Sequence, residues 1–133
     1  MNLLFICKAN RFRSRVAEAI FNHHNKNKKV EVKSAGVNLD TIRLYVAKII
    51  IDLLNKKGIK MNDEKSRPVD ENLIKWADKI VIVADNVDPN LFPKEKREVW
   101  KIEDADESEV EKVKIIINKI EGKVKYFLKT LKV

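Results

Sequence analysis

The sequence has 133 residues, of which 44% are hydrophobic and 36% are charged, a composition that excludes a disordered chain and predicts one folded domain over residues 1–133. Its single cysteine excludes an intramolecular disulfide, and its longest apolar run, KIIIDLL at 48–54, is too short to span a membrane. The formal net charge of +8 favours anionic partners. Because the chain begins without a signal-peptide pattern and has no disulfide, we expect a cytoplasmic protein with no membrane partner.

Strand-like and helix-like segments alternate along the chain. Four segments have the short apolar pattern of strands: 2–6, 30–36, 78–85 and 97–102. Four others have apolar residues at helical spacing: 14–24, 41–57, 71–77 and 110–131. Gly58 suits the position just past the second helix, and the segment 87–96 is predicted as loop or short helix. This alternation predicts an α/β fold, a single-domain four-stranded parallel sheet flanked by helices on both faces.

The only cysteine directly follows the first predicted strand, within CKANRFRS at 7–14. In open α/β sheets, ligands bind beyond the carboxyl ends of the strands, where the N-terminus of the following helix adds about half a positive charge. Such a place stabilises an anion, whether a bound phosphate or the thiolate of Cys7. Arg13 can donate two N–H groups to phosphate oxygens, and the Ser14 hydroxyl can donate to the thiolate. The alternative is a buried strand-end cysteine beside a surface arginine.

The stretch CKANRFRSRVAE resembles the signature of the low-molecular-weight protein tyrosine phosphatase family, whose relatives include arsenate reductases. That signature is Cys-x-Gly-Asn-x-x-Arg-Ser after a first strand, followed by Ala-Glu, and Glu18 completes the match here. The resemblance continues through four later segments: KSAG (33–36), KKGI (56–59), SRPVDENLIKWADKIVIV (66–83) and VWKIEDADESE (99–109). It covers nearly the whole chain in order and implies a phosphate-binding loop after the first strand.

The resemblance implies a phosphatase that hydrolyses phosphomonoesters, either protein phosphotyrosine or small aryl or acyl phosphates, through an S-phosphocysteine intermediate. Cys7 would attack phosphorus, while Arg13 and the loop N–H groups would hold the phosphate oxygens. The substrate-binding residues would be those of the loop: Lys8, Ala9, Asn10, Arg11, Phe12 and Ser14. Asn10 would brace the loop, because asparagine tolerates left-handed backbone geometry. The partners would be a phosphorylated protein or a small phosphate ester, and this chemistry requires no metal and no other cofactor.

The family's general acid is an aspartate in an Asp-Pro pair before the last helix. The literal pair in this chain, Asp88-Pro89, follows the third strand, where proline favours the start of a short helix. Asp104 has the family's placement after the fourth strand, and we expect it to protonate the leaving oxygen although Ala105 follows it. Asp106 is close enough to compete for this role. For Asp88 and Asp106 we favour helix capping or solvation.

Several departures from the family pattern leave the preference for aryl phosphates open. Ala9 replaces the family's glycine, so the loop must avoid left-handed geometry there or tolerate strain. Phe12 stands where many members carry a second cysteine, and DADESE at 104–109 lacks the aromatic residues that wall the cleft in phosphotyrosine-specific relatives, although Tyr45 could lie nearby. Lys8 and Arg11 either replace aromatic contacts with charge, which favours a more anionic substrate, or are exposed loop residues.

Three other functions compete with phosphatase activity. With one cysteine, a thiol-relay arsenate reductase is excluded, whereas an arsenate reductase that uses an external small thiol stays open. A non-catalytic phosphate- or phosphoprotein-binding module would keep Arg13 and the loop without effective acid catalysis, and the altered acid motif favours it. Nucleic-acid binding rests on net charge alone, because the basic patch NHHNKNKK at 22–29 has no interleaved aromatic residues.

Overall fold

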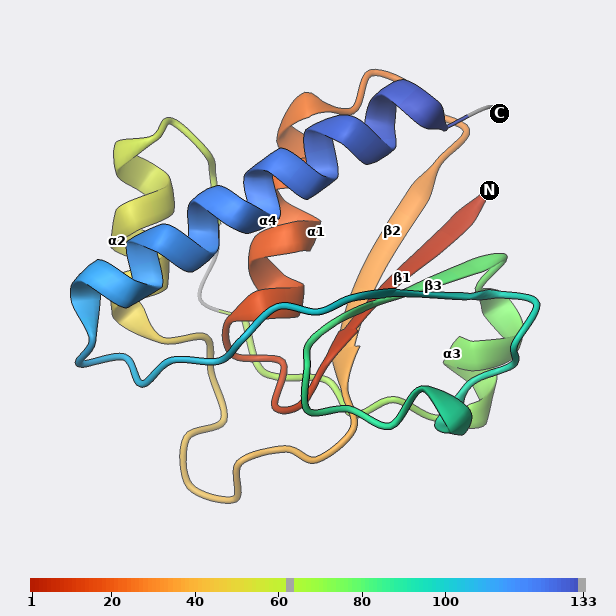
Figure 1. Cartoon of the computed structure of the whole chain (residues 1–133), viewed down its shortest axis with the longest axis horizontal. Helices are drawn as coiled ribbons and strands as arrows, with labels where there is room; N and C mark the ends of the chain where they lie inside the picture. Colours follow the sequence, from red (N-terminus) through yellow and green to blue (C-terminus); the bar gives the residue numbers. More distant parts are fainter. Residues whose placement is uncertain (62–63, 132–133) are drawn as a thin grey trace.

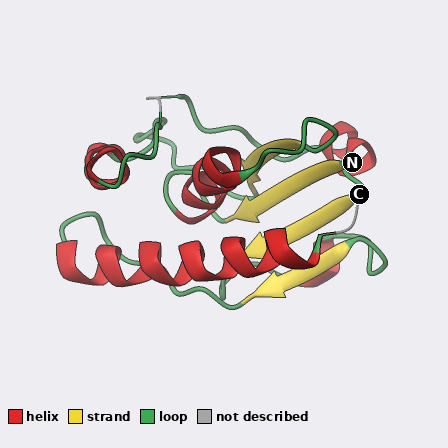
Figure 2. Cartoon of the chain, turned by 90° about the horizontal axis from the view of Figure 1, so that it is seen from above, coloured by secondary structure: helices red, strands yellow, loops and turns green. Residues whose placement is uncertain are grey.

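The computed structural model describes residues 1–61 and 64–131. Its sheet contains four strands: β1 (Asn2–Cys7), β2 (Glu31–Gly36), β3 (Lys79–Val83) and β4 (Arg97–Trp100). The strands are all parallel and lie in the order β2-β1-β3-β4, so the strand arrows point toward the same edge of the sheet (Figure 2). The predicted four-stranded parallel sheet is confirmed.

Helices cover both faces of this sheet, as predicted. They are α1 (Arg13–His24), α2 (Lys48–Lys56), α3 (Glu71–Trp76), α4 (Val110–Thr130) and the short 3-10 helix η1 (Pro89–Leu91). Helices α1, α2 and α4 pack on one face, where α4 crosses over α1 (Figure 1), and α3 packs on the other. Among the described residues, no helix is both long enough and apolar enough to cross a membrane.

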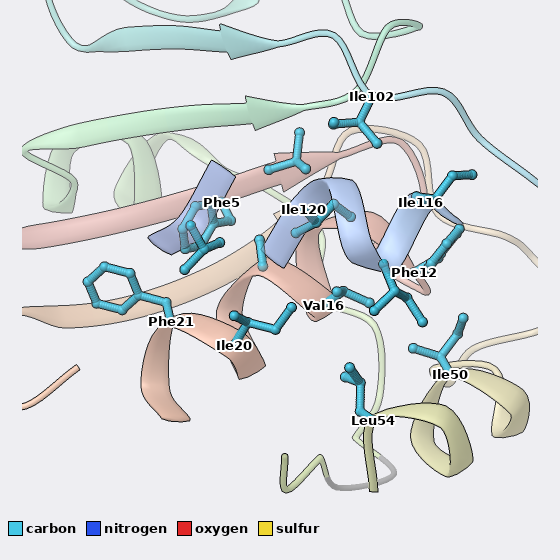
Figure 3. Packing of buried hydrophobic residues seen from close by; sticks show 14 of the residues in the cluster. Phe5, Phe12, Val16, Ile20, Phe21, Ile50, Leu54, Ile102, Ile116 and Ile120 are labelled. Atoms are coloured by element: carbon cyan, nitrogen blue, oxygen red, sulfur yellow. The ribbon is translucent and has the colours of Figure 1, made fainter. Parts of the chain in front are cut away.

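Strand β1 is buried on both faces, which explains why its sequence is apolar without alternation. Phe5 belongs to the larger hydrophobic cluster beneath α1 and α4 (Figure 3). Leu3 belongs to the same cluster. Leu4 and Ile6 point to the opposite face and belong to the smaller cluster beside α3. Because all four side chains are fully buried, β1 is a rigid support for the residues that follow its carboxyl end.

The helix predicted over 41–57 is wrong in its first half, because α2 begins only at Lys48. The preceding residues form a loop in which the Asp40 carboxylate accepts hydrogen bonds from the backbone N–H groups of Ile42 and Arg43, each at 2.8 Å. Ile42 is 87% exposed, so its helical spacing does not reflect burial. The predicted end of the helix is confirmed, since Gly58, with φ of 76°, lies directly past it and suits the left-handed backbone of a helix end.

Candidate active site

The loop of residues 8–12 joins β1 to α1 at the carboxyl edge of the sheet. Strand β1 has β2 on one side and β3 on the other, so this loop lies where the order of connection reverses, the usual ligand site of open α/β sheets. The loop borders a cavity of about 380 Å³. Of the predicted site residues, six line this cavity: Cys7, Ala9, Arg11, Phe12, Arg13 and Asp104. Lys8, Asn10 and Ser14 do not: Lys8 is exposed, and the other two are buried behind the loop.

The Cys7 sulfur lies in surroundings that suit an anion. Its side chain is only 2% exposed, and Sγ lies 2.9 Å from the hydroxyl oxygen of Ser14 in the first turn of α1. That oxygen already accepts a hydrogen bond of 2.8 Å from the Asn10 amide, so its own proton is free to be donated to the sulfur. Among the described residues, no side chain caps the N-terminus of α1, which leaves its first N–H groups available to an anion.

Asn10 braces the loop from behind. Its φ of 56° is the only positive value of any non-glycine residue in the described part of the chain, so Ala9 avoids left-handed geometry. The amide of Asn10 also donates to Ser34 Oγ at 3.0 Å, and its Oδ1 accepts the backbone N–H of Arg67 at 3.0 Å. The backbone carbonyl of Asn10 accepts from the Ser66 hydroxyl at 3.2 Å. These contacts attach the loop both to β2 and to the segment before α3.

Ser34 continues the network to a partly buried carboxylate. Its hydroxyl donates to Glu18 Oε1 at 2.6 Å, and Arg15 Nη1 lies 3.7 Å from the same oxygen. Burial raises the pKa of the Glu18 carboxyl above its ordinary value, an effect that the hydrogen bond from Ser34 partly offsets. Sequence analysis found Glu18 only as part of the motif, without this contact.

Gly36 supports the loop through a close backbone approach that sequence analysis did not anticipate. A Cβ at this position would lie 2.7 Å from the Lys8 carbonyl oxygen and 2.9 Å from backbone atoms of Ala9 and Asn10. The backbone N–H of Asn38 donates to the same Lys8 carbonyl at 2.8 Å. The glycine that ends KSAG was the available signal, since glycine within a strand often marks such an approach.

The Arg13 guanidinium contacts the segments that follow two strands, β3 and β4. The side chain is almost fully buried and donates to the Ile102 carbonyl and to Asn86 Oδ1, both at 2.9 Å. It also lies 3.6 Å from Asp85 Oδ1 and 3.5 Å from Asp104 Oδ2. Sequence analysis missed Asp85 and Asn86. Both lie just past the carboxyl end of β3, the strand next to β1, where ligand-binding residues are expected.

The three candidate aspartates have different surroundings. Asp104 lines the cavity, and its half-exposed carboxylate faces Arg13. Asp106 also lines the cavity, but hydrogen bonds from the hydroxyl and the backbone N–H of Ser108 hold its pKa below the ordinary value. Asp88 caps η1 by accepting the Asn90 N–H at 2.9 Å and is absent from the cavity lining, as its position before Pro89 predicts.

The outer lining of the cavity is charged rather than aromatic. It includes Asp40, Arg43, Glu107 and Glu109, and Phe12 is the only aromatic residue of the described chain that contributes to it. Tyr45 is half exposed and is not among the described residues that line the cavity, although its backbone carbonyl accepts from Arg11 Nε at 2.8 Å.

Comparison with known proteins gives a consistent assignment. The family model described as low molecular weight phosphotyrosine protein phosphatase matches residues 2–133. A low molecular weight protein tyrosine phosphatase from T. tengcongensis is 26% identical, with a TM-score of 0.86 over 98% of this chain and 99% of that one. An arsenate reductase from Archaeoglobus fulgidus DSM 4304 is 29% identical, with a TM-score of 0.80 over 96% of this chain and 98% of that one. A thioredoxin-dependent arsenate reductase from Corynebacterium glutamicum is 24% identical over 97% of this chain, which spans only 60% of that protein, with a TM-score of 0.75. The chain therefore belongs to the low molecular weight phosphotyrosine protein phosphatase family.

Proposed function

We propose that the protein hydrolyses phosphomonoesters through an S-phosphocysteine intermediate formed on Cys7. The observation that carries this proposal is the position of the Cys7 sulfur beside the cavity, 2.9 Å from a serine hydroxyl whose proton is free. The uncapped N-terminus of α1 adds further donors on the same side. These donors can stabilise the negative charge of an oxyanion bound next to the sulfur.

The proposed reaction has two steps. The Cys7 thiolate attacks phosphorus, an S–P bond forms, and the P–O bond to the leaving group breaks while Asp104 transfers its proton to the leaving oxygen. Water, deprotonated by Asp104, then attacks phosphorus, and the S–P bond breaks to release phosphate and the thiolate. Arg13 and the N–H groups of the 8–12 loop hold the three equatorial oxygens in both steps. The Ser14 hydroxyl stabilises the departing sulfur.

Asp104 is preferred to Asp106 as the acid in this proposal. A general acid must carry a proton near the operating pH, and the hydrogen bonds from Ser108 stabilise the ionised form of Asp106 instead. Among the described residues, the Asp104 carboxylate accepts a single hydrogen bond, from the backbone N–H of Ala105 at 2.9 Å.

The proposed substrates are phosphorylated proteins or small phosphate esters as a class, rather than phosphotyrosine alone. Phe12 is the only aromatic side chain of the described cavity lining and is 9% exposed, so ring stacking contributes little to substrate recognition. Charged side chains form most of the outer lining.

Turnover of para-nitrophenyl phosphate by purified protein tests the proposal. Cys7→Ser and Arg13→Ala should each abolish turnover, because they remove the nucleophile and the guanidinium that lines the same cavity. Arg97→Ala is a matched control, since Arg97 donates to the Phe92 carbonyl away from the cavity. Absent wild-type turnover, or turnover that survives Cys7→Ser, contradicts the proposal. Phosphate binding without any turnover supports the non-catalytic binding module.

Arsenate reduction with an external small thiol is a second candidate. The observation that favours it is the 29% identity to the arsenate reductase from Archaeoglobus fulgidus, together with the oxyanion-binding character of the loop. Cys7 would take up arsenate, and two molecules of the small thiol would supply two electrons, leaving arsenite and a disulfide. Arsenate-dependent oxidation of glutathione that disappears in Cys7→Ser would support this reaction, and its absence would contradict it.

A further inference from the structure

Two arginines from different segments converge on one carboxylate at the rim of the Cys7 cavity. Glu107 Oε1 lies 2.8 Å from Arg43 Nη1 and 3.6 Å from Arg11 Nη2. Arg11 belongs to the 8–12 loop, Arg43 to the segment between β2 and α2, and Glu107 to the segment between β4 and α4 that also carries Asp104. All three line the cavity, and we call them the rim triad.

The local structure holds both arginines in position for this contact. Asp40 accepts the backbone N–H of Arg43 at 2.8 Å and its Nε at 3.1 Å, which orients the guanidinium toward Glu107. Arg11 Nε donates to the Tyr45 carbonyl at 2.8 Å, so the 8–12 loop and the 37–47 segment form one wall. Glu107 belongs to the opposite wall.

Through the rim triad, the outer part of the segment between β4 and α4 makes a polar contact with the wall formed by the 8–12 loop and the 37–47 segment. Ile102, at the inner end of the segment, is buried and accepts from Arg13. From Ala105 to Glu109, the other hydrogen bonds in the described chain stay within the segment or lead into α4, as between Asp106 and Ser108. Glu103 pairs with Lys119 of α4 at 2.8 Å, on the side away from the cavity.

We propose that Glu107 is a positioning residue for Asp104, and that the rim triad holds the segment 103–109 where Asp104 reaches the leaving oxygen. The inference rests on the proposed function, because it assigns Asp104 the role of general acid. Arg43 and Glu107 are partly exposed, with side-chain exposures of 52% and 37%, so each pair is weak alone. The triad therefore sets how often the segment occupies the productive position, and its loss weakens acid catalysis without removing it.

A series of aryl phosphates with leaving groups of rising pKa tests this role. A poor leaving group such as phenoxide needs a proton from Asp104, whereas 2,4-dinitrophenolate leaves without one. Glu107→Gln and Arg43→Gln should each lower kcat/KM about fivefold for phenyl phosphate, the rate equivalent of one exposed ion pair, and by less than about twofold for 2,4-dinitrophenyl phosphate. Arg43→Lys keeps the charge and should restore most of the loss. In an Asp104→Asn background, Glu107→Gln should cost nothing further.

Glu103→Gln is the matched control, because it removes an ion pair of the same length from the same segment on the side away from the cavity. It should leave kcat/KM unchanged for every leaving group. Equal losses across the leaving groups, no loss at all, or the same loss in Glu103→Gln would each overturn the positioning role while wild-type turnover upholds the proposed function. A wild-type protein that turns over none of these esters overturns both.

Discussion

Replacing Gly36 by alanine adds one methyl group against the backbone of the 8–12 loop. The new Cβ would lie 2.7 Å from the Lys8 carbonyl oxygen, whereas ordinary van der Waals contact begins at 3.4 Å. Either the backbone at residue 36 or the backbone at Lys8 must therefore move by about 0.7 Å. The obstructing atoms belong to the backbone, so no side-chain rotation relieves the contact. The loop cannot recede without lengthening the 2.8 Å hydrogen bond from Asn38 to Lys8.

Two effects follow from this displacement. Overpacking of this kind costs about 1–3 kcal/mol, so the free energy of unfolding should fall by that amount. The loop N–H groups that are proposed to hold the phosphate oxygens would move by a comparable distance, and a misplacement of about 1 Å costs about a hundredfold in rate. We expect kcat/KM for para-nitrophenyl phosphate to fall between about tenfold and a hundredfold.

Urea denaturation and steady-state kinetics measure both effects. Gly122→Ala is the control, because a Cβ on Gly122 meets nothing within 4 Å and the residue lies inside α4. That change should stabilise the protein by about 0.5–1 kcal/mol through helix propensity and leave kcat/KM unchanged. If Gly36→Ala keeps both the wild-type free energy of unfolding and the wild-type kcat/KM, the close approach does not constrain the loop.

Two further predictions concern aspartates. Asp104→Asn should lower kcat/KM for phenyl phosphate by about a hundredfold, as expected for loss of a general acid. Asp88→Asn should lower it by less than about twofold. The reverse ranking would contradict the assignment of Asp104 as the general acid. The N–H groups of Arg43 and Ile42 lower the pKa of Asp40 from 3.8 to about 2. Since its folded pKa is lower than its unfolded pKa, this stabilisation is present above pH 3.8 and is lost as the pH falls toward 2. In chemical denaturation, the free energy of unfolding of Asp40→Asn should therefore fall less steeply than that of the wild type as the pH decreases from 3.8 to about 2. Equal slopes in the two proteins would refute this.

The elements that the sequence predicts well are those whose burial follows from their own pattern. The run NLLFI is apolar at every position because β1 is covered on both faces, and its partner strands follow the same logic. The segment 41–47 has helical spacing but is held as a loop by distant partners. The Leu44 carbonyl accepts the Ser66 N–H at 2.7 Å, and the Tyr45 carbonyl accepts from Arg11. Those partners are remote in sequence, so local periodicity carries no signal of them.

The residues of the candidate site likewise fall into two groups, those that the sequence predicts and those that only the structure reveals. Cys7, Arg13 and Ser14 lie within one short motif, so their proximity follows from the turn between a strand and a helix. Asp85 and Arg43 reach the cavity region only through the order of the strands and the course of the long loops, as their contacts with Arg13 and Glu107 show. The sequence indicates which strand ends meet at one edge, but not which side chains from those ends touch.

Asn10 combines two requirements that few residues meet together. The backbone there is left-handed, with φ of 56°, and the side chain donates two hydrogen bonds while accepting a third. Glycine supplies the backbone freedom but no amide, aspartate tolerates the backbone but has no N–H to donate when ionised, and glutamine has the amide on a side chain one carbon longer. Among the twenty standard amino acids, asparagine alone satisfies both demands, so no interchangeable substitute is available to evolution or to protein engineering at this position.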